Sequence, residues 1–186
     1  MITWLWRAYD LAYRWLHGLR DLPTEKGTIL RMGVERHRGS RVMLRDGTVV
    51  EPGDLVGTIH FHNEAVAALH DGKINPVRSG ILILRGFERS LYALARLSDD
   101  QPRYREVKAF TATTIFYQSM EGFGFEVHPP PSGWRSRVVA AYERFVLSRF
   151  HPLGRERGNQ GKFQDVRTVW ISSEAVKRRY GRVPRT

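Results

Sequence analysis

The side chains best suited to chemistry in this sequence lie in one short run, GDLVGTIHFHN, over residues 53–63. A strand predicted over residues 55–62 places His60 and His62 on the same face, because side chains two apart in a strand point the same way. Two such imidazoles can hold a divalent metal or act as a general base. Asp54, just before the strand, is the predicted partner that orients the base.

A catalytic metal normally requires a third protein ligand beside the two histidines. The spacing selects none, and the candidates are Asp54, Glu64, His70 and His128. We predict no other cofactor, and a divalent metal stays an open prediction. In the alternative interpretation, one imidazole packs and hydrogen-bonds while the other is solvated at the sheet edge.

The position of this run also favours a ligand-binding site. In open α/β sheets, ligands bind at the carboxyl ends of strands, beside helix N-termini whose free N–H groups favour anions. If the strands predicted over residues 55–62 and 107–111 are neighbours, their ends form one crevice. Its lining would be His60, His62, Asn63, Thr111, Thr113 and Thr114, with Arg78 and Ser79 from the loop before the next long helix. In the alternative interpretation, the asparagine and the threonines only cap helices.

Three long helices are predicted from amphipathic spacing, over residues 2–20, about 81–94 and about 134–145. In the second of them we expect Ile81 and Leu84 to lie in the core. Shorter helices are predicted over residues 63–69, 114–121 and 173–180, with Asn63, Thr114 and either Ser172 or Ser173 as their caps.

The predicted strands cover residues 28–36, 41–50, 55–62, 107–111, 125–128 and 168–171. Asp46-Gly47 divides the second of these into a β-hairpin, because this dipeptide favours a two-residue turn. Together the elements predict one α/β or α+β sandwich over residues 1–186. We expect a mixed sheet of about five to six strands with an N-terminal β-hairpin, packed by the three long helices.

The composition excludes several classes of protein. The 186 residues include no cysteine, which rules out disulfides, thiolate chemistry and cysteine zinc sites. The longest apolar run, Gly80–Leu84, is far shorter than the roughly 20 residues of a membrane span. Arg7, Asp10 and Arg14 interrupt any signal-peptide core. We expect a cytoplasmic protein that can also lie peripherally at the inner face of the membrane.

The positive charge is concentrated in the last third of the chain. The net charge is +11, and residues 131–186 contain 13 Lys or Arg and 4 Asp or Glu. This basic C-terminal third, with a mobile loop predicted over residues 151–165, indicates a polyanionic partner such as an anionic membrane or a phosphorylated ligand. Nucleic acid is less favoured, because no helix-turn-helix, RRM or KH pattern is visible.

Two of the predicted helices combine tryptophan with arginine. They are the N-terminal amphipathic helix within residues 1–22 and the helix that begins near residue 134. This combination is typical of elements that lie on a membrane surface. The alternative is an apolar stripe that faces the core and a solvated basic back.

Several motifs together resemble the bacterial YkoP-like domain. They are residues 39–54, Ile59-His-Phe-His-Asn63, Phe110-Thr-Ala-Thr-Thr114, Gly122-Phe-Gly-Phe-Glu-Val127, and Val169-Trp-Ile-Ser-Ser173 before Tyr180-Gly181. The resemblance covers nearly the whole chain. Members of the family occur alone or fused to polysaccharide deacetylase or glycosyltransferase modules, which implies a connection with the cell envelope. The resemblance implies no catalytic residue set.

The leading hypothesis is an accessory ligand-binding domain. It would recognise a phosphorylated or lipid-linked envelope intermediate at the membrane surface through the predicted crevice. One alternative is a hydrolase or transferase on the same precursors, with His60 or His62 as base or metal ligand. A second alternative is a nucleic-acid-binding protein that uses the basic C-terminal third. The sequence leaves the oligomeric state open.

Overall fold

A computed structural model describes residues 20–21, 27–62, 65–66, 69, 75–114, 116–129 and 167–181. In chain order, the helices and strands are β1 (Arg20–Asp21), β2 (Leu30–Arg36), β3 (Val42–Met43), β4 (Val49–Val50), β5 (Leu55–Phe61), α3 (Pro76–Asp100), α4 (Pro102–Arg105), β6 (Ala109–Thr114), α5 (Tyr117–Gly122), β7 (Glu126–His128), β8 (Arg167–Ser172) and α8 (Ser173–Tyr180). The predicted loop over residues 151–165 and the predicted helix near residue 134 lie outside the described residues. So does most of the predicted N-terminal helix, but its last residues form strand β1 instead.

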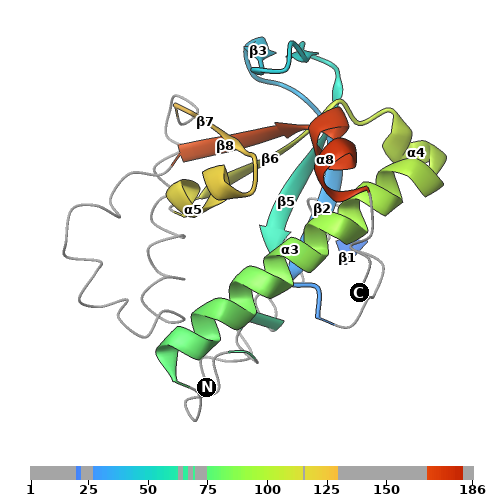
Figure 1. Ribbon diagram of the computed structural model, residues 1–186. Coiled ribbons are helices and arrows are strands. Elements are labelled where there is room, and N and C mark those ends of the chain that lie inside the picture. The colour runs from blue at the N-terminus through green and yellow to red at the C-terminus, as the bar shows by residue number, and fades with distance from the viewer. Residues whose placement is uncertain are drawn as a thin grey trace, which may run out of the picture.

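The predicted mixed sheet is confirmed. Six strands form it in the order β1-β2-β5-β6-β8-β7 (Figure 1). Strands β5 and β6 pair in parallel, and the other four pairs are antiparallel. The parallel pair confirms that the ends of these two strands lie at the same edge of the sheet. With helices packed on this sheet, the class is α+β.

A separate two-stranded sheet, β3 with β4, forms the predicted hairpin. Val42 pairs with Val50 and Met43 with Val49. The turn between them follows from its residues: Gly47 has a φ of 87°, which favours glycine, and Asp46 accepts a hydrogen bond from the Thr48 amide at 3.0 Å. The prediction from Asp46-Gly47 is therefore confirmed.

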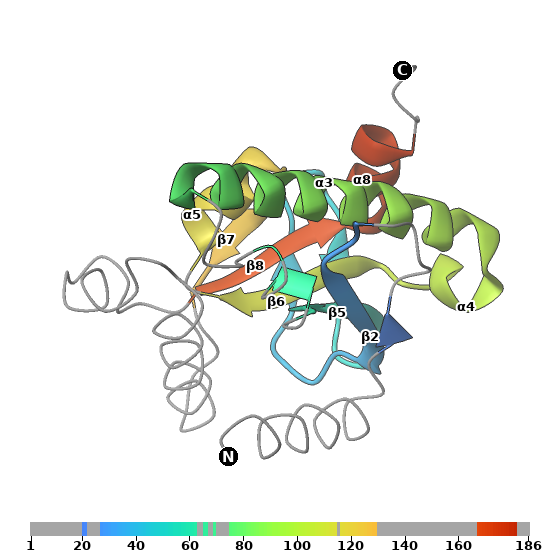
Figure 2. The same ribbon diagram turned by 90° about the horizontal axis from the view of Figure 1, so that it is seen from below.

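Helix α3 covers one face of the sheet and is the one predicted long helix that lies within the described residues. It begins where the Asn75 side chain accepts a hydrogen bond from the Val77 amide at 2.9 Å and Pro76 fixes the first turn. Figure 2 shows α3 and α8 on the same side of the strands. The buried residues Phe87, Leu91 and Leu94 of α3 form the main core with side chains of the sheet. None of the helices in the described part of the chain combines the length and apolar character of a bilayer span.

The first half of α3 corrects the core prediction. Ile81 and Leu84, which we expected in the core, are 45% and 48% exposed. In Figure 1 this half of the helix extends past the end of strand β5. Its side with Ser79 and Ile83 is still buried or packed on the core, but the side with Ile81 and Leu84 is not covered. The apolar spacing correctly predicted a shared face, but only the part of that face above the sheet is buried.

The opposite face of the sheet carries a second, smaller core. Leu44 and Val50 of the hairpin pack there against Val56, Ala109 and Trp170. The hairpin therefore covers the end of this face at which β5 begins. The same alternation of side chains that sends Phe110 toward α3 sends Ala109 toward the hairpin.

Gly57 is required by the packing of the two central strands. It pairs with Phe110 across the parallel strands β5 and β6. A Cβ at this position would lie 2.4 Å from Cδ1 of Phe110 and 3.1 Å from the sulfur of Met32. Phe110 is fully buried and has no room to move away, so only glycine fits beneath its ring.

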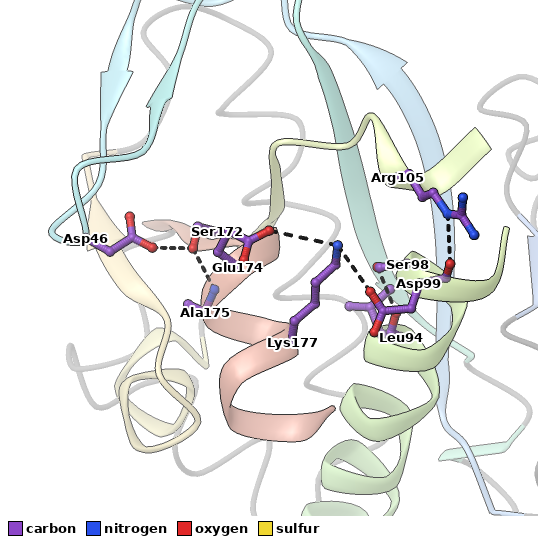
Figure 3. Close-up of polar contacts among 9 residues, drawn as sticks. All are labelled: Asp46, Leu94, Ser98, Asp99, Arg105, Ser172, Glu174, Ala175 and Lys177. Carbon is purple, nitrogen blue, oxygen red and sulfur yellow. Dashed lines mark hydrogen bonds and ion pairs between the residues drawn. The ribbon is translucent and has the colours of Figure 1, made fainter. Parts of the chain in front are cut away.

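The start of α8 is joined to both the hairpin and α3 (Figure 3). Of the two predicted caps, Ser172 is the N-cap of α8, and its hydroxyl accepts a hydrogen bond from the Ala175 amide at 2.9 Å. The same hydroxyl donates to Asp46 in the hairpin turn. One turn further along the helix, Lys177 forms an ion pair with Asp99 of α3 at 3.2 Å. These contacts fix the hairpin and α3 to the same helix.

Candidate functional site

The sheet face opposite α3 is rich in polar side chains beyond the part that the hairpin covers. Strand register places these side chains together: Thr58 pairs with Thr111, and Thr113 pairs with Thr168. We call this set the polar face, and its members are Arg31, Thr58, His60, Thr111, Thr113, Glu126, His128 and Thr168. Five strands contribute to it, so it is a long-range feature of the fold.

Two hydroxyls at the centre of the polar face are buried and have no hydrogen-bond partner in the described part of the chain. They belong to Thr111 and Thr168, each with 9% of its surface exposed. Thr168 pairs with Thr113, two residues from Thr111, so the two hydroxyls are diagonal neighbours, within about 8 Å of each other. Most buried polar groups in proteins are hydrogen-bonded, and two adjacent exceptions therefore indicate a place where a ligand can supply the partner.

Arg31 brings a positive charge to the same face. It pairs with His60 across strands β2 and β5 and is 2% exposed. Its Nη2 lies 2.9 Å from Nε2 of His62, beyond the end of β5. Arg31 thus adds a buried positive charge to the face that carries the two threonine hydroxyls, two strands from Thr111 and three from Thr168. Charged and neutral donors together suit a phosphate or carboxylate group.

His62 has a structural role at the start of the next helical turn. Its Nδ1 accepts a hydrogen bond from the Ala65 amide at 3.0 Å, and its carbonyl accepts one from the Val66 amide at 3.0 Å. The imidazole thus acts as a helix cap, the role that we predicted for Asn63, a residue outside the described part of the chain. With Nε2 against Arg31 and Nδ1 against the amide, His62 has no nitrogen left for a metal ion.

The described residues contain no group of three His, Asp or Glu that could hold a metal. His128 lies on β7, three strands from His60, which is roughly 14 Å at the usual strand spacing. Glu64 and His70, the other candidates, lie outside the described residues. The prediction that Asp54 completes a metal site or orients a histidine base is wrong. Asp54 precedes β5 by one residue and lies six residues, or about 20 Å, from His60.

Asp54 instead anchors the loop before β5. Its Oδ2 accepts hydrogen bonds from Nζ of Lys108 at 2.8 Å and from the Glu51 amide at 2.7 Å. The Lys108 side chain, together with that amide, holds the pKa of Asp54 below its ordinary value. This carboxylate therefore stays ionised and stabilises the local structure.

Three further predicted residues lie away from the polar face. Arg78 is exposed on α3, and Ser79 is buried within it, on the other side of the sheet. Thr114 points to the α3 side as well, because it follows Thr113 in the strand. Its hydroxyl accepts a hydrogen bond from the Phe116 amide at 3.0 Å, and helix α5 begins three residues later than predicted. The structure thus brings together His60, Thr111 and Thr113 of the predicted crevice.

Sequence reasoning missed Arg31, Thr58, Glu126 and Thr168. Thr58 is two residues before His60, so the strand period already placed it on that face. Thr168 lies in a strand that was predicted, but its position beside Thr113 depends on a pairing between strands far apart in the sequence. The place of Arg31 likewise depends on the antiparallel register of β2 with β5.

Glu126 and His128 lie at the edge of the polar face, where Glu126 contacts the hairpin. Glu126 accepts a hydrogen bond from the Arg45 amide at 2.8 Å. Its other oxygen lies 3.8 Å from Nε2 of His128 and 3.9 Å from the Arg45 guanidinium. The Arg45 guanidinium therefore offsets part of the negative charge of Glu126 at this edge of the face.

Comparison with known proteins gives one family. The family model of the YkoP domain matches residues 1–180. A curated protein of Bacillus subtilis (strain 168), named Uncharacterized protein YkoP, is 25% identical over 126 residues, which are 68% of this chain and 69% of that protein. No solved structure matches the chain. The residues matched by the family model include every member of the polar face.

Proposed function

The chain belongs to the YkoP domain family, and we propose that it is an accessory ligand-binding protein of cell-envelope metabolism. The ligand in this proposal is a phosphorylated or lipid-linked intermediate, bound on the polar face close to a membrane surface. The observation that carries the proposal is the pair of buried, partnerless hydroxyls of Thr111 and Thr168. The envelope connection rests only on what the family resemblance implies, namely fusion of its members to deacetylase or glycosyltransferase modules.

A phosphate group fits the donors of the polar face. Threonine hydroxyls donate to phosphate oxygens, and the Arg31 guanidinium adds a charged donor two strands away from β6. Because Arg31, Thr111 and Thr168 are buried, a hydrogen bond from one of them to an anion is stronger than the same bond at the surface. An uncharged ligand would satisfy the hydroxyls but would gain nothing from Arg31.

Binding has more support than hydrolysis or group transfer. The proposed base would need a carboxylate to orient it, and Asp54 lies at the other end of β5. His62 uses both ring nitrogens in contacts with protein groups. The nucleic-acid alternative rests on the basic C-terminal third, of which only residues 167–181 are described.

The proposal can be tested with three probes: a short-chain isoprenyl phosphate, the corresponding isoprenol, and a nucleotide sugar. We expect the phosphorylated probes to raise the Tm of the protein and to bind measurably by titration calorimetry, and the isoprenol to do neither. Thr111→Val and Thr168→Val should each weaken binding by about ten-fold or more, because each removes a buried hydrogen bond to a charged group.

Thr114→Val is the matched control, since Thr114 lies in the same strand but faces α3. It should leave binding unchanged. The proposal is wrong if neither phosphorylated probe binds, or if Thr111→Val and Thr168→Val bind the probes as tightly as the wild type does. Binding of the isoprenol with equal affinity would replace the phosphate in the proposal by an uncharged ligand.

A further inference from the structure

The first half of α3 carries an exposed apolar stripe made of Val77, Ile81 and Leu84. These side chains are 71%, 45% and 48% exposed. They lie at positions i, i+4 and i+7, so they share one line along the helix. Glu88, one turn after Leu84, ends this line with a charge. The stripe is thus confined to the part of α3 that extends past the sheet (Figure 1).

Two arginines flank the stripe on one side. Arg78 and Arg85 are seven residues apart and therefore project from the same side of α3, next to Ile81. Both are exposed, and within the described part of the chain neither guanidinium has a hydrogen bond or an ion pair. The first turn of α3 contains no acidic residue either, so the positive end of the helix dipole is not offset there.

This combination suits a lipid surface better than a second protein. Three apolar side chains cover only a small part of the roughly 800 Å² that each partner of a stable protein interface buries. At a bilayer surface, a short apolar stripe enters the boundary between headgroups and acyl chains. The arginines beside it then reach the lipid phosphates with their apolar stems still buried. Anionic lipids match the charge of both arginines and of the helix end.

We propose that the first half of α3 is the element through which this protein docks on an anionic bilayer. The inference rests on the proposed function only in that both place the protein at a membrane surface. Its residues lie on the opposite side of the sheet from Thr111 and Thr168, so the two can fail separately.

The test is sedimentation of the full chain with vesicles of phosphatidylglycerol and phosphatidylcholine, compared with vesicles of phosphatidylcholine alone. Wild-type protein should sediment with the anionic vesicles at low salt, and more weakly at high salt. The double variant Ile81→Ser/Leu84→Ser should lower the partition constant by at least about ten-fold. Arg78→Gln/Arg85→Gln should do the same on anionic vesicles.

Met43→Ser is the matched control, because Met43 is also an exposed apolar residue, 68% exposed, but lies in the hairpin. It should bind vesicles as the wild type does, and so should Thr111→Val. Inorganic phosphate should displace the protein from the vesicles no more than sodium chloride of the same ionic strength does, since docking does not use the polar face.

Four results would overturn the inference. The first is no sedimentation of the wild type with anionic vesicles, and the second is unchanged binding by Ile81→Ser/Leu84→Ser. The third is a dimer in sedimentation velocity that this double variant dissociates, which would make the stripe an interface between two copies. The fourth is loss of vesicle binding in Thr111→Val alone, which would assign the lipid to the polar face instead.

Discussion

Replacement of Thr111 by valine should stabilise the unliganded protein. Valine keeps the shape of the side chain and puts a methyl group where the hydroxyl was. That hydroxyl is buried and has no hydrogen-bond partner in the described residues. A buried polar group without a partner costs about 1–3 kcal/mol, so Thr111→Val should raise the free energy of unfolding by about that amount. For a chain of this length, each kcal/mol corresponds to about 2–4 °C in Tm.

Thr114→Val, three residues along the same strand, should change the free energy of unfolding in the opposite direction. Thr114 is 3% exposed, but its hydroxyl accepts a hydrogen bond from the Phe116 amide at 3.0 Å. Its loss leaves that amide without a partner and should lower the free energy of unfolding by about 1–3 kcal/mol. Urea denaturation followed by tryptophan fluorescence measures both variants. A loss of about 1 kcal/mol or more in Thr111→Val would show that its hydroxyl already has a partner, and the argument for a ligand would fail.

Three further substitutions test the packing and the polar contacts. Gly57→Ala should lower the free energy of unfolding by about 1–3 kcal/mol in urea denaturation, because the added Cβ meets the ring of Phe110. The control is Gly122→Ala, where an added Cβ has no atom within 4 Å. Ser172→Ala should cost about 1–2 kcal/mol in the same assay, since it removes the α8 cap and the bond to Asp46, whereas Ser173→Ala removes a hydroxyl with no partner and should cost little. Burial raises the pKa of Asp46, but hydrogen bonds from Ser172 and Thr48 and the charge of Arg178 outweigh it and leave that pKa below its ordinary value. The ionised Asp46 therefore stabilises the fold above about pH 4, and this contribution disappears as the pH falls through the lowered pKa. When Tm is measured against pH, the Tm of Asp46→Asn should fall less on the acid side than that of the wild type.

Much of the fold followed from local patterns. Alternation predicted β5, the Asp46-Gly47 dipeptide predicted the hairpin turn, and a serine before an amphipathic run predicted the start of α8. Each of these signals acts within a few residues, so the sequence contains it directly. The burial of α3 was different. Its spacing showed that Ile81 and Leu84 share a face with Leu91, but whether the sheet reaches far enough to cover them depends on tertiary structure.

The candidate site was predicted in part for a related reason. His60, Thr111 and Thr113 lie together because two strands, predicted separately, are parallel neighbours. Asp54 is close to His60 in sequence, but an extended strand separates its two ends by about 3.3 Å per residue. Thr168 and Arg31 come from strands whose register with β5 and β6 no local pattern specifies. Strand pairing therefore decided both the correct and the wrong assignments.

The two partnerless hydroxyls support the proposed ligand, because the strands themselves gain nothing from them. Valine has at least as high a preference for strands as threonine and would remove a cost of about 1–3 kcal/mol at each position. That cost is large beside the 5–15 kcal/mol, in order of magnitude, that holds a typical domain folded. The third buried hydroxyl without a partner, that of Ser173, lies in the first turn of α8, away from the polar face. The two on the polar face, Thr111 and Thr168, lie in adjacent strands, where nothing local favours a threonine over a valine. A ligand that accepts hydrogen bonds from both hydroxyls would give the threonines a function. The free energy that the two hydroxyls cost in the unliganded protein would then be recovered when the ligand binds.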